Sequence, residues 1–168
     1  MSAPRLTAPD TASTPGEVRP LVERIAAFNE RLHLSDVHIR RLIGEVFARP
    51  PLPVARIGFH VAAPDVQIQQ SQFACRFTQR VVLLDEGNQQ LAMVEVTCVL
   101  EFQLDDGPEP DTEALSAYVD HNAYFIAHPY LREAVQATTA KLGLDPIVLG
   151  ILRRSEARPS EIIIGRSG

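Results

Sequence analysis

Four side chains in the C-terminal half could bind a metal ion or exchange a proton: Asp120, His121, His128 and Glu133. Their spacing matches no known pattern of metal ligands. Pro129 also interrupts any single helical face that would align them. We therefore expect these residues to cap helices or to lie in an interface, and we expect no metal or other cofactor.

The two cysteines, Cys75 and Cys98, are a second candidate for chemistry. With a tight turn centred on Glu86–Gly87, the segments that carry them pair so that the two thiols face each other, which makes a redox pair one hypothesis. The alternative is two buried thiols that pack as small apolar side chains, and this is the outcome we expect.

No other pattern in the sequence indicates catalysis. There is no glycine-rich phosphate loop, no nucleophile elbow and no HExxH helix. Neither Ser35 nor Ser71 has a recognisable base partner. We therefore expect no enzymatic activity, although residues that converge from distant positions leave that alternative open.

The bulk properties bound the class of protein. The chain has 168 residues, 45% of them hydrophobic, which is enough for one domain with a core. A net charge of −5 argues against nucleic acid as a partner. Residues 1–16 lack the apolar run of a signal peptide, and no segment approaches the roughly 20 apolar residues of a membrane span. We expect a cytoplasmic protein without membrane insertion.

Apolar periodicity divides the chain into parts. Residues 1–15 are rich in Pro, Ser, Thr and Ala and indicate a disordered arm, residues 16–153 the folded domain, and residues 154–168 a flexible tail. Within the domain, apolar residues at three- and four-residue spacings predict an amphipathic helix from Glu17 to Leu34.

Four segments that alternate in polarity predict strands at residues 37–46, 55–61, 73–83 and 94–102. A change of phase at Arg40–Arg41 predicts a β-bulge in the first strand. In the hairpin of the last two, the turn at Glu86–Gly87 would pair Phe77 with Val96 and place the apolar residues of both strands on one face.

Helical signals follow the strands. Asp111 is expected to cap a helix, the chain to kink near Asn122, and a second helix to run from about Pro129 to Gly143. Pro146 then opens a short extended segment. This order predicts an α+β fold, a four-stranded antiparallel sheet with helices packed on one face, plus the N-terminal helix.

Large apolar side chains gather at the proline-rich segment after the first strand and at the helical connection. Such surfaces, beside strand edges, could accept extended peptides through main-chain pairing and side-chain pockets. On composition alone, the alternative that they complete the core and an oligomer interface is favoured. The two groups are Phe47, Leu52, Val54, Ile57 and Phe59, and Tyr118, Tyr124, Phe125 and Tyr130.

Several motifs over about residues 37–152 resemble a known family. Phe125, Pro129-Tyr130, Arg132-Glu133, Pro146 and Leu149 resemble, in type and order, the long helix and final extended stretch of SecB export chaperones. The runs Pro110-Asp111-Thr112-Glu113-Ala114-Leu115, Ala117-Tyr118 and Ile151-Leu152 are similar to the SecB-like chaperones of toxin–antitoxin–chaperone systems.

The resemblance implies a homo-oligomer, a dimer of dimers, that acts as an ATP-independent holdase for unfolded polypeptides. In the export branch the clients are preproteins passed to SecA, and in the other branch the client is an unstable antitoxin. Residues 155–168 are polar and contain proline, so we expect no counterpart of the C-terminal helix of export SecB, which puts SecA docking in doubt. It also adds an N-terminal helix and has only a mild negative charge.

These departures favour a chaperone dedicated to an antitoxin. Its groove would be lined by seven residues: Phe47, Leu52, Ile57, Phe59, Tyr118, Tyr124 and Phe125. The alternative is a non-catalytic ligand-binding or scaffolding domain that shares the topology.

Overall fold

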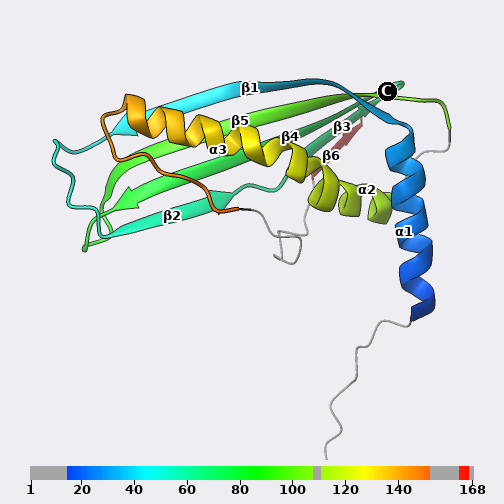
Figure 1. Cartoon of the computed structure of the whole chain (residues 1–168), viewed down its shortest axis with the longest axis horizontal. Coiled ribbons are helices and arrows are strands. Elements are labelled where there is room, and N and C mark those ends of the chain that lie inside the picture. Colours follow the sequence, from blue (N-terminus) through cyan, green and yellow to red (C-terminus); the bar gives the residue numbers. More distant parts are fainter. Residues whose placement is uncertain (1–14, 108–110, 152–162, 167–168) are drawn as a thin grey trace, which may run out of the picture.

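A computed structural model describes residues 15–107, 111–151 and 163–166, with side chains described for residues 21–107 and 111–151. The predicted arm, apart from Pro15, and most of the predicted tail lie outside the described residues. The architecture is α+β, one sheet with a helical layer on one of its faces (Figure 1), as the sequence predicts.

The sheet is built on a long hairpin. Strands β4 (Gln72–Leu84) and β5 (Gln90–Leu104) lie at its centre, and β1 (Leu32–Val46) pairs with the outer side of β5. On the other side, β2 (Arg56–Val61) and β3 (Asp65–Gln69) pair in succession with β4. These pairs are antiparallel, and the four predicted strands are all present.

Two further strands were not predicted. β3 has only two apolar residues, Val66 and Ile68, so its alternation is short and follows directly on Pro64. β6 (Ile163–Arg166) lies in the predicted tail and pairs in parallel with β3. A four-residue strand far from its partner in sequence leaves no periodic signal.

The hairpin register differs from the prediction by two residues. Phe77 lies opposite Cys98, and Cys75 lies opposite Leu100, so the two cysteines are not paired. The turn is longer than expected: the Asp85 N–H donates to the Gln89 carbonyl at 3.1 Å, and Asn88 adopts φ of 65°. Because the shift is even, the predicted apolar face is preserved.

The first helix and strand also meet at a different residue. Helix α1 spans Pro15–Glu30, whereas the prediction extended it to Leu34. Leu32 instead starts β1 opposite Leu104, because the backbone finds its partners on β5. The predicted bulge is present, as a register shift between Ile39 and Arg41.

The helical layer is one nearly continuous rod. It comprises α2 (Thr112–Tyr118), a π-helical turn η1 (Val119–Ala123) at the predicted kink, and α3 (Tyr124–Lys141). Asp111 caps α2 by accepting from the Ala114 N–H at 2.9 Å. Pro129 lies inside α3 and does not begin it.

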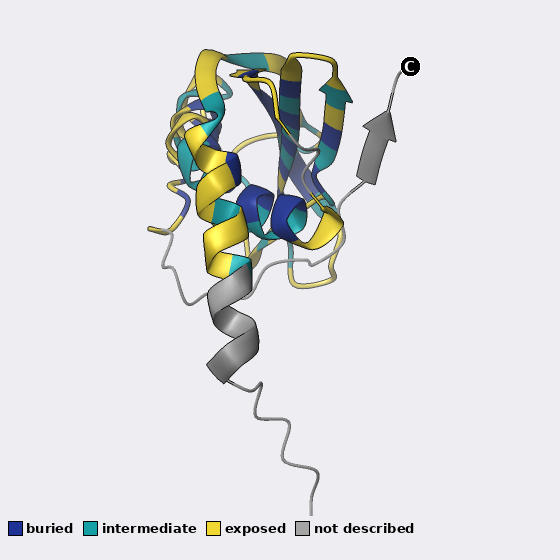
Figure 2. Cartoon of the chain, turned by 90° about the vertical axis from the view of Figure 1, so that its right-hand side faces the viewer, coloured by how far each residue is buried: buried dark blue, intermediate teal, exposed yellow. Residues whose placement is uncertain are grey.

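The core lies between this layer and the apolar face of the hairpin (Figure 2). The Tyr118 ring lies 5.2 Å from Phe28 of α1, 6.0 Å from Phe73 of β4 and 6.2 Å from Phe102 of β5, measured between centroids. Arg24 adds ion pairs from α1 to Asp111 at 2.9 Å and Glu113 at 2.6 Å. These contacts join α1, α2 and the sheet at one end of the molecule.

Gly44 of β1 allows α3 to approach the sheet closely. A Cβ atom at this position would lie 2.8 Å from Thr138 Cγ2 and 2.9 Å from Leu142 Cδ1. We expect Gly44→Val to lower the free energy of unfolding by about 1–3 kcal/mol, the usual cost of overpacking, as measured by urea denaturation. Gly150→Val is the matched control, because a Cβ at Gly150 meets nothing within 4 Å. Equal stability of the two variants would contradict this account.

Candidate functional site

An apolar depression, a groove of about 320 Å³, lies at the end of the sheet where α3 terminates. One wall is the proline-rich connection between β1 and β2, and the other is the segment that follows α3 (Figure 1). The floor includes the end of β4. Its apolar lining comes from Pro50, Pro51, Leu52, Val54, Ile57, Leu83, Leu144 and Ile147.

The wall after α3 is held in place by one buried hydroxyl. Gly143, at φ of +74°, ends the helix and turns the chain back toward β2. The Thr139 hydroxyl then accepts a hydrogen bond from the Ile147 N–H at 3.0 Å and donates within its own helix, 3.0 Å from the Gln136 carbonyl oxygen. Ile147 and Leu149 are buried, so the extended segment is anchored on alternate residues.

Several large apolar side chains on β2 and on the connection between β1 and β2 are exposed. The exposed fractions are 53% for Phe47, 43% for Ile57 and 52% for Phe59. Leu52, on the connection between β1 and β2, is half-buried and packs against the core. Val148 and Ile151, on the wall after α3, are also exposed. Large exposed apolar side chains gathered around a groove are typical of a surface that binds another chain.

Of the seven predicted residues, Leu52 and Ile57 line the groove. Phe59 lies two residues after Ile57 on β2, and Phe47 directly follows β1, where its N–H donates to the Leu91 carbonyl at 2.8 Å. Tyr118 and Tyr124 are buried, at 1% and 6% exposure, and line no surface of the described chain. Both face the sheet, Tyr118 in the cluster with Phe28 and Tyr124 against Phe77 at 5.4 Å. Phe125 is half-buried on α3 and does not line the groove.

Sequence reasoning missed the wall formed by residues 143–151 and the role of Thr139. The short apolar run Ile147-Val148-Leu149 after Pro146 gave a signal for an extended segment. That signal does not show where the segment lies, because its position on the sheet depends on where α3 ends.

The titratable candidates do not form a reactive centre. Within the described part of the chain no three His, Cys, Asp or Glu residues are placed to hold a metal ion. His121 and Glu133 are exposed, and the His128 ring packs 5.8 Å from that of Tyr124. Both cysteines are buried free thiols, as expected, and burial raises the pKa of Cys98 to about 11 and that of Cys75 well above its ordinary value.

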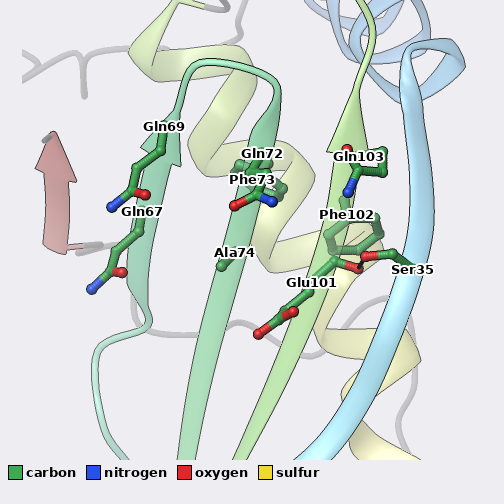
Figure 3. A pocket seen from close by; sticks show the side chains of 9 residues that line it. All are labelled: Ser35, Gln67, Gln69, Gln72, Phe73, Ala74, Glu101, Phe102 and Gln103. Carbon is green, nitrogen blue, oxygen red and sulfur yellow. Dashed lines mark hydrogen bonds between the residues drawn. The ribbon is translucent and has the colours of Figure 1, made fainter. Parts of the chain in front are cut away.

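A second depression, of about 160 Å³, lies on the face of the sheet opposite the helices (Figure 3). Its polar lining is mostly glutamine: Gln67 and Gln69 of β3, Gln72 of β4 and Gln103 of β5. The Ser35 hydroxyl donates to the Glu101 carbonyl at 2.9 Å beside a bulge in β1. Amide side chains and one carboxylate can donate and accept hydrogen bonds there.

Comparisons with known proteins agree with the fold. No family model matches the chain. Two curated proteins do, the SecB-like chaperones Rv1957 and MT2006 of Mycobacterium tuberculosis strains H37Rv and CDC 1551, each 36% identical over 61 residues. That match covers 36% of this chain and about a third, 34%, of each relative.

A solved structure extends the similarity over most of the chain. It is the Mycobacterium tuberculosis SecB-like chaperone Rv1957 in complex with a ChAD peptide from the HigA1 antitoxin. The superposition has a TM-score of 0.66 and 26% identity, and it covers 83% of this chain and 99% of that one. The resemblance to the SecB-like chaperones is confirmed. We take the groove beside the β1–β2 connection of this chain as its candidate functional site.

Thr139 provides a test of how the groove wall is held. We expect Thr139→Val, which keeps the shape but loses the acceptor, to leave the Ile147 N–H without its partner. The free energy of unfolding should fall by about 1–3 kcal/mol, the cost of an unsatisfied buried donor. Hydrogen exchange at Ile147 should accelerate more than exchange in β5. Thr138→Val is the matched control, and an equal effect of both variants would contradict the assignment.

The thiols provide a second test. Because burial raises their pKa, Cys75 and Cys98 should resist an aromatic disulfide reagent at pH 8 in the folded protein and react at once in denaturant. With a pKa of about 11, Cys98 would be roughly 0.1% thiolate at that pH. Rapid labelling of the native protein would revive the redox hypothesis.

Proposed function

We propose that this protein is a chaperone that binds extended, non-native polypeptide, with an antitoxin as its dedicated client. The observation that carries the proposal is the fold match to a SecB-like chaperone that was solved with an antitoxin peptide, over 99% of that chaperone's chain. The exposed apolar groove supports it independently, because a stable core has no need of Phe47 and Phe59 at more than half exposure.

The geometry suits an unfolded segment better than a small molecule. The groove is open, and its apolar surface continues along β2, which pairs only with β4 among the described residues. An extended peptide can therefore combine side-chain burial in the groove with main-chain hydrogen bonds to a strand edge. Main-chain pairing is independent of sequence, whereas the groove selects apolar side chains.

A holding function of this kind involves no catalysis and no ATP. We extend the proposal to a cytoplasmic homo-oligomer, a dimer of dimers, on the strength of the family resemblance. The outer edge of β1 favours self-association, since β1 pairs with β5 alone in the described chain and exposes Leu34 and Leu42. None of the described helices is long and apolar enough to span a membrane. The link to protein export rests on the resemblance alone.

The first experiment is light scattering by a chemically unfolded model protein diluted into buffer without ATP. Suppression of scattering near a stoichiometric ratio would establish a general holdase. If scattering is unchanged, the next measurement is binding to the C-terminal peptide of an antitoxin encoded beside this gene. Binding would support a dedicated chaperone, and no binding would contradict the proposal.

Truncation of the exposed surface tests where clients bind. We expect the triple variant F47A/I57A/F59A to weaken client binding at least tenfold, because about 2 kcal/mol of apolar burial would be lost per large side chain. Its melting temperature should change little, because the three side chains are exposed. Val22→Ala, at a 57% exposed position on α1, is the control away from the groove. A triple variant that unfolds would assign these residues to the core.

A further inference from the structure

The C-terminal strand β6 occupies a sheet edge that would otherwise be open. β6 aligns Ile163 with Asp65, Ile164 with Val66 and Arg166 with Ile68. It lies beside β3 at the margin of the glutamine-lined face (Figure 3). This is the one parallel pair of the sheet as described, and its two partners are about a hundred residues apart in sequence.

The edge covered by β6 is continuous with the edge left open at β2. β2 and β3 follow each other along β4, with Val61 opposite Gln79 and Asp65 opposite Arg76. The Ala62 N–H still donates to the Thr78 carbonyl at 3.0 Å, so the chain stays on β4 between the two strands. An extended segment that pairs with β2 and continues in line reaches the position of β6.

We propose that the outer edge of β3 is a strand-accepting site, which this chain's own C-terminal strand occupies until an extended client segment displaces it. The inference rests on the proposed function for the identity of the competitor. The occupant is a short segment of this chain that contains Ile163 and Ile164 and pairs with β3. Isoleucine has a high strand propensity.

Several properties of the β3–β6 pair favour the replacement of β6 by another strand. β6 has four residues, and parallel pairing is slightly less stable per residue than antiparallel pairing. It adds to the end of a complete sheet, so its release leaves the hairpin and the helical layer intact. The covalent tether gives it a high effective concentration, and a longer client strand compensates with more hydrogen bonds and with the groove.

The expected change in client affinity depends on the fraction of molecules in which β6 occupies the edge of β3. If β6 holds the edge in about nine molecules of ten, the apparent affinity for any competitor is about tenfold lower than the intrinsic affinity. Removing β6 should therefore raise that affinity about tenfold.

The first experiment tests the site without any client. A fluorescein-labelled synthetic peptide of residues 159–168 is titrated by anisotropy with the full chain and with a chain that ends at Ser160. We expect the shortened chain to bind the peptide about tenfold more tightly. A peptide with proline at the positions of Ile163 and Ile164 is the control, since proline cannot donate to the ladder. Equal binding to both chains, or no binding to either, would overturn the proposal.

Hydrogen exchange checks the location. In a strand paired on both sides, successive amides point to opposite neighbours. The shortened chain should lose protection at alternate residues of β3, those on the β6 side, while the amides bonded to β4 stay protected. The full-length double variant I163P/I164P should reproduce this pattern and show that the loss of β6, not chain length, is the cause. Unchanged protection in both would overturn the proposal.

A third measurement separates this proposal from the proposed function. The unfolded model protein, or the antitoxin peptide, is titrated with the full and shortened chains. Tighter binding to the shortened chain supports competition at the edge. Equal binding overturns the competitive role of β6 and leaves the chaperone function standing. Binding to neither chain, with the 159–168 peptide still captured, contradicts the chaperone function and the competition with clients together.

Discussion

The contact of the Tyr118 ring with Phe28, Phe73 and Phe102 is the interaction on which the rest of the arrangement depends. It joins three parts of the chain that are remote in sequence, α1, the central hairpin and the start of the helical layer. Edge-on aromatic contacts of this kind fix relative orientation as well as burying area. With one end of the rod fixed there, α2, η1 and α3 run across the apolar face of β4 and β5, and the close approach at Gly44 fixes the other end.

This arrangement leaves apolar surface uncovered where the rod stops. The helical layer covers the apolar face of the hairpin, but β2 lies beside it at the margin of the sheet, and the proline-rich connection lies beyond the end of α3 (Figure 1). The chain after Gly143 returns toward them as an extended segment and buries only alternate residues. The outcome is an open groove lined by Leu52 and Ile57, with the exposed Phe59 nearby on the edge strand β2. A surface of this kind suits an extended chain.

Periodicity within one segment predicted local structure well. It predicted the pairing between segments poorly. The apolar face of the hairpin, the bulge near Arg40, the Asp111 cap and the stop at Gly143 all follow from local residue patterns. The hairpin register was two residues off, because the turn closed around Asp85–Gln89 and not around Glu86–Gly87 alone. Tyr118 and Tyr124 looked like surface aromatics in sequence, since nothing local shows that Phe28 and Phe77 cover them.

The sequence by itself determined four of the six strands, the presence of the helices and which face of the hairpin is apolar, because these follow from periods of two and 3.6 residues. It also carried the motifs that resemble SecB-like chaperones. Only the tertiary structure decided which of the remaining apolar residues stay in solvent, and that the C-terminal strand lies on β3. Exposure depends on which distant segment covers a side chain, and an edge strand depends on hydrogen bonds between backbones, which every residue except proline can form alike.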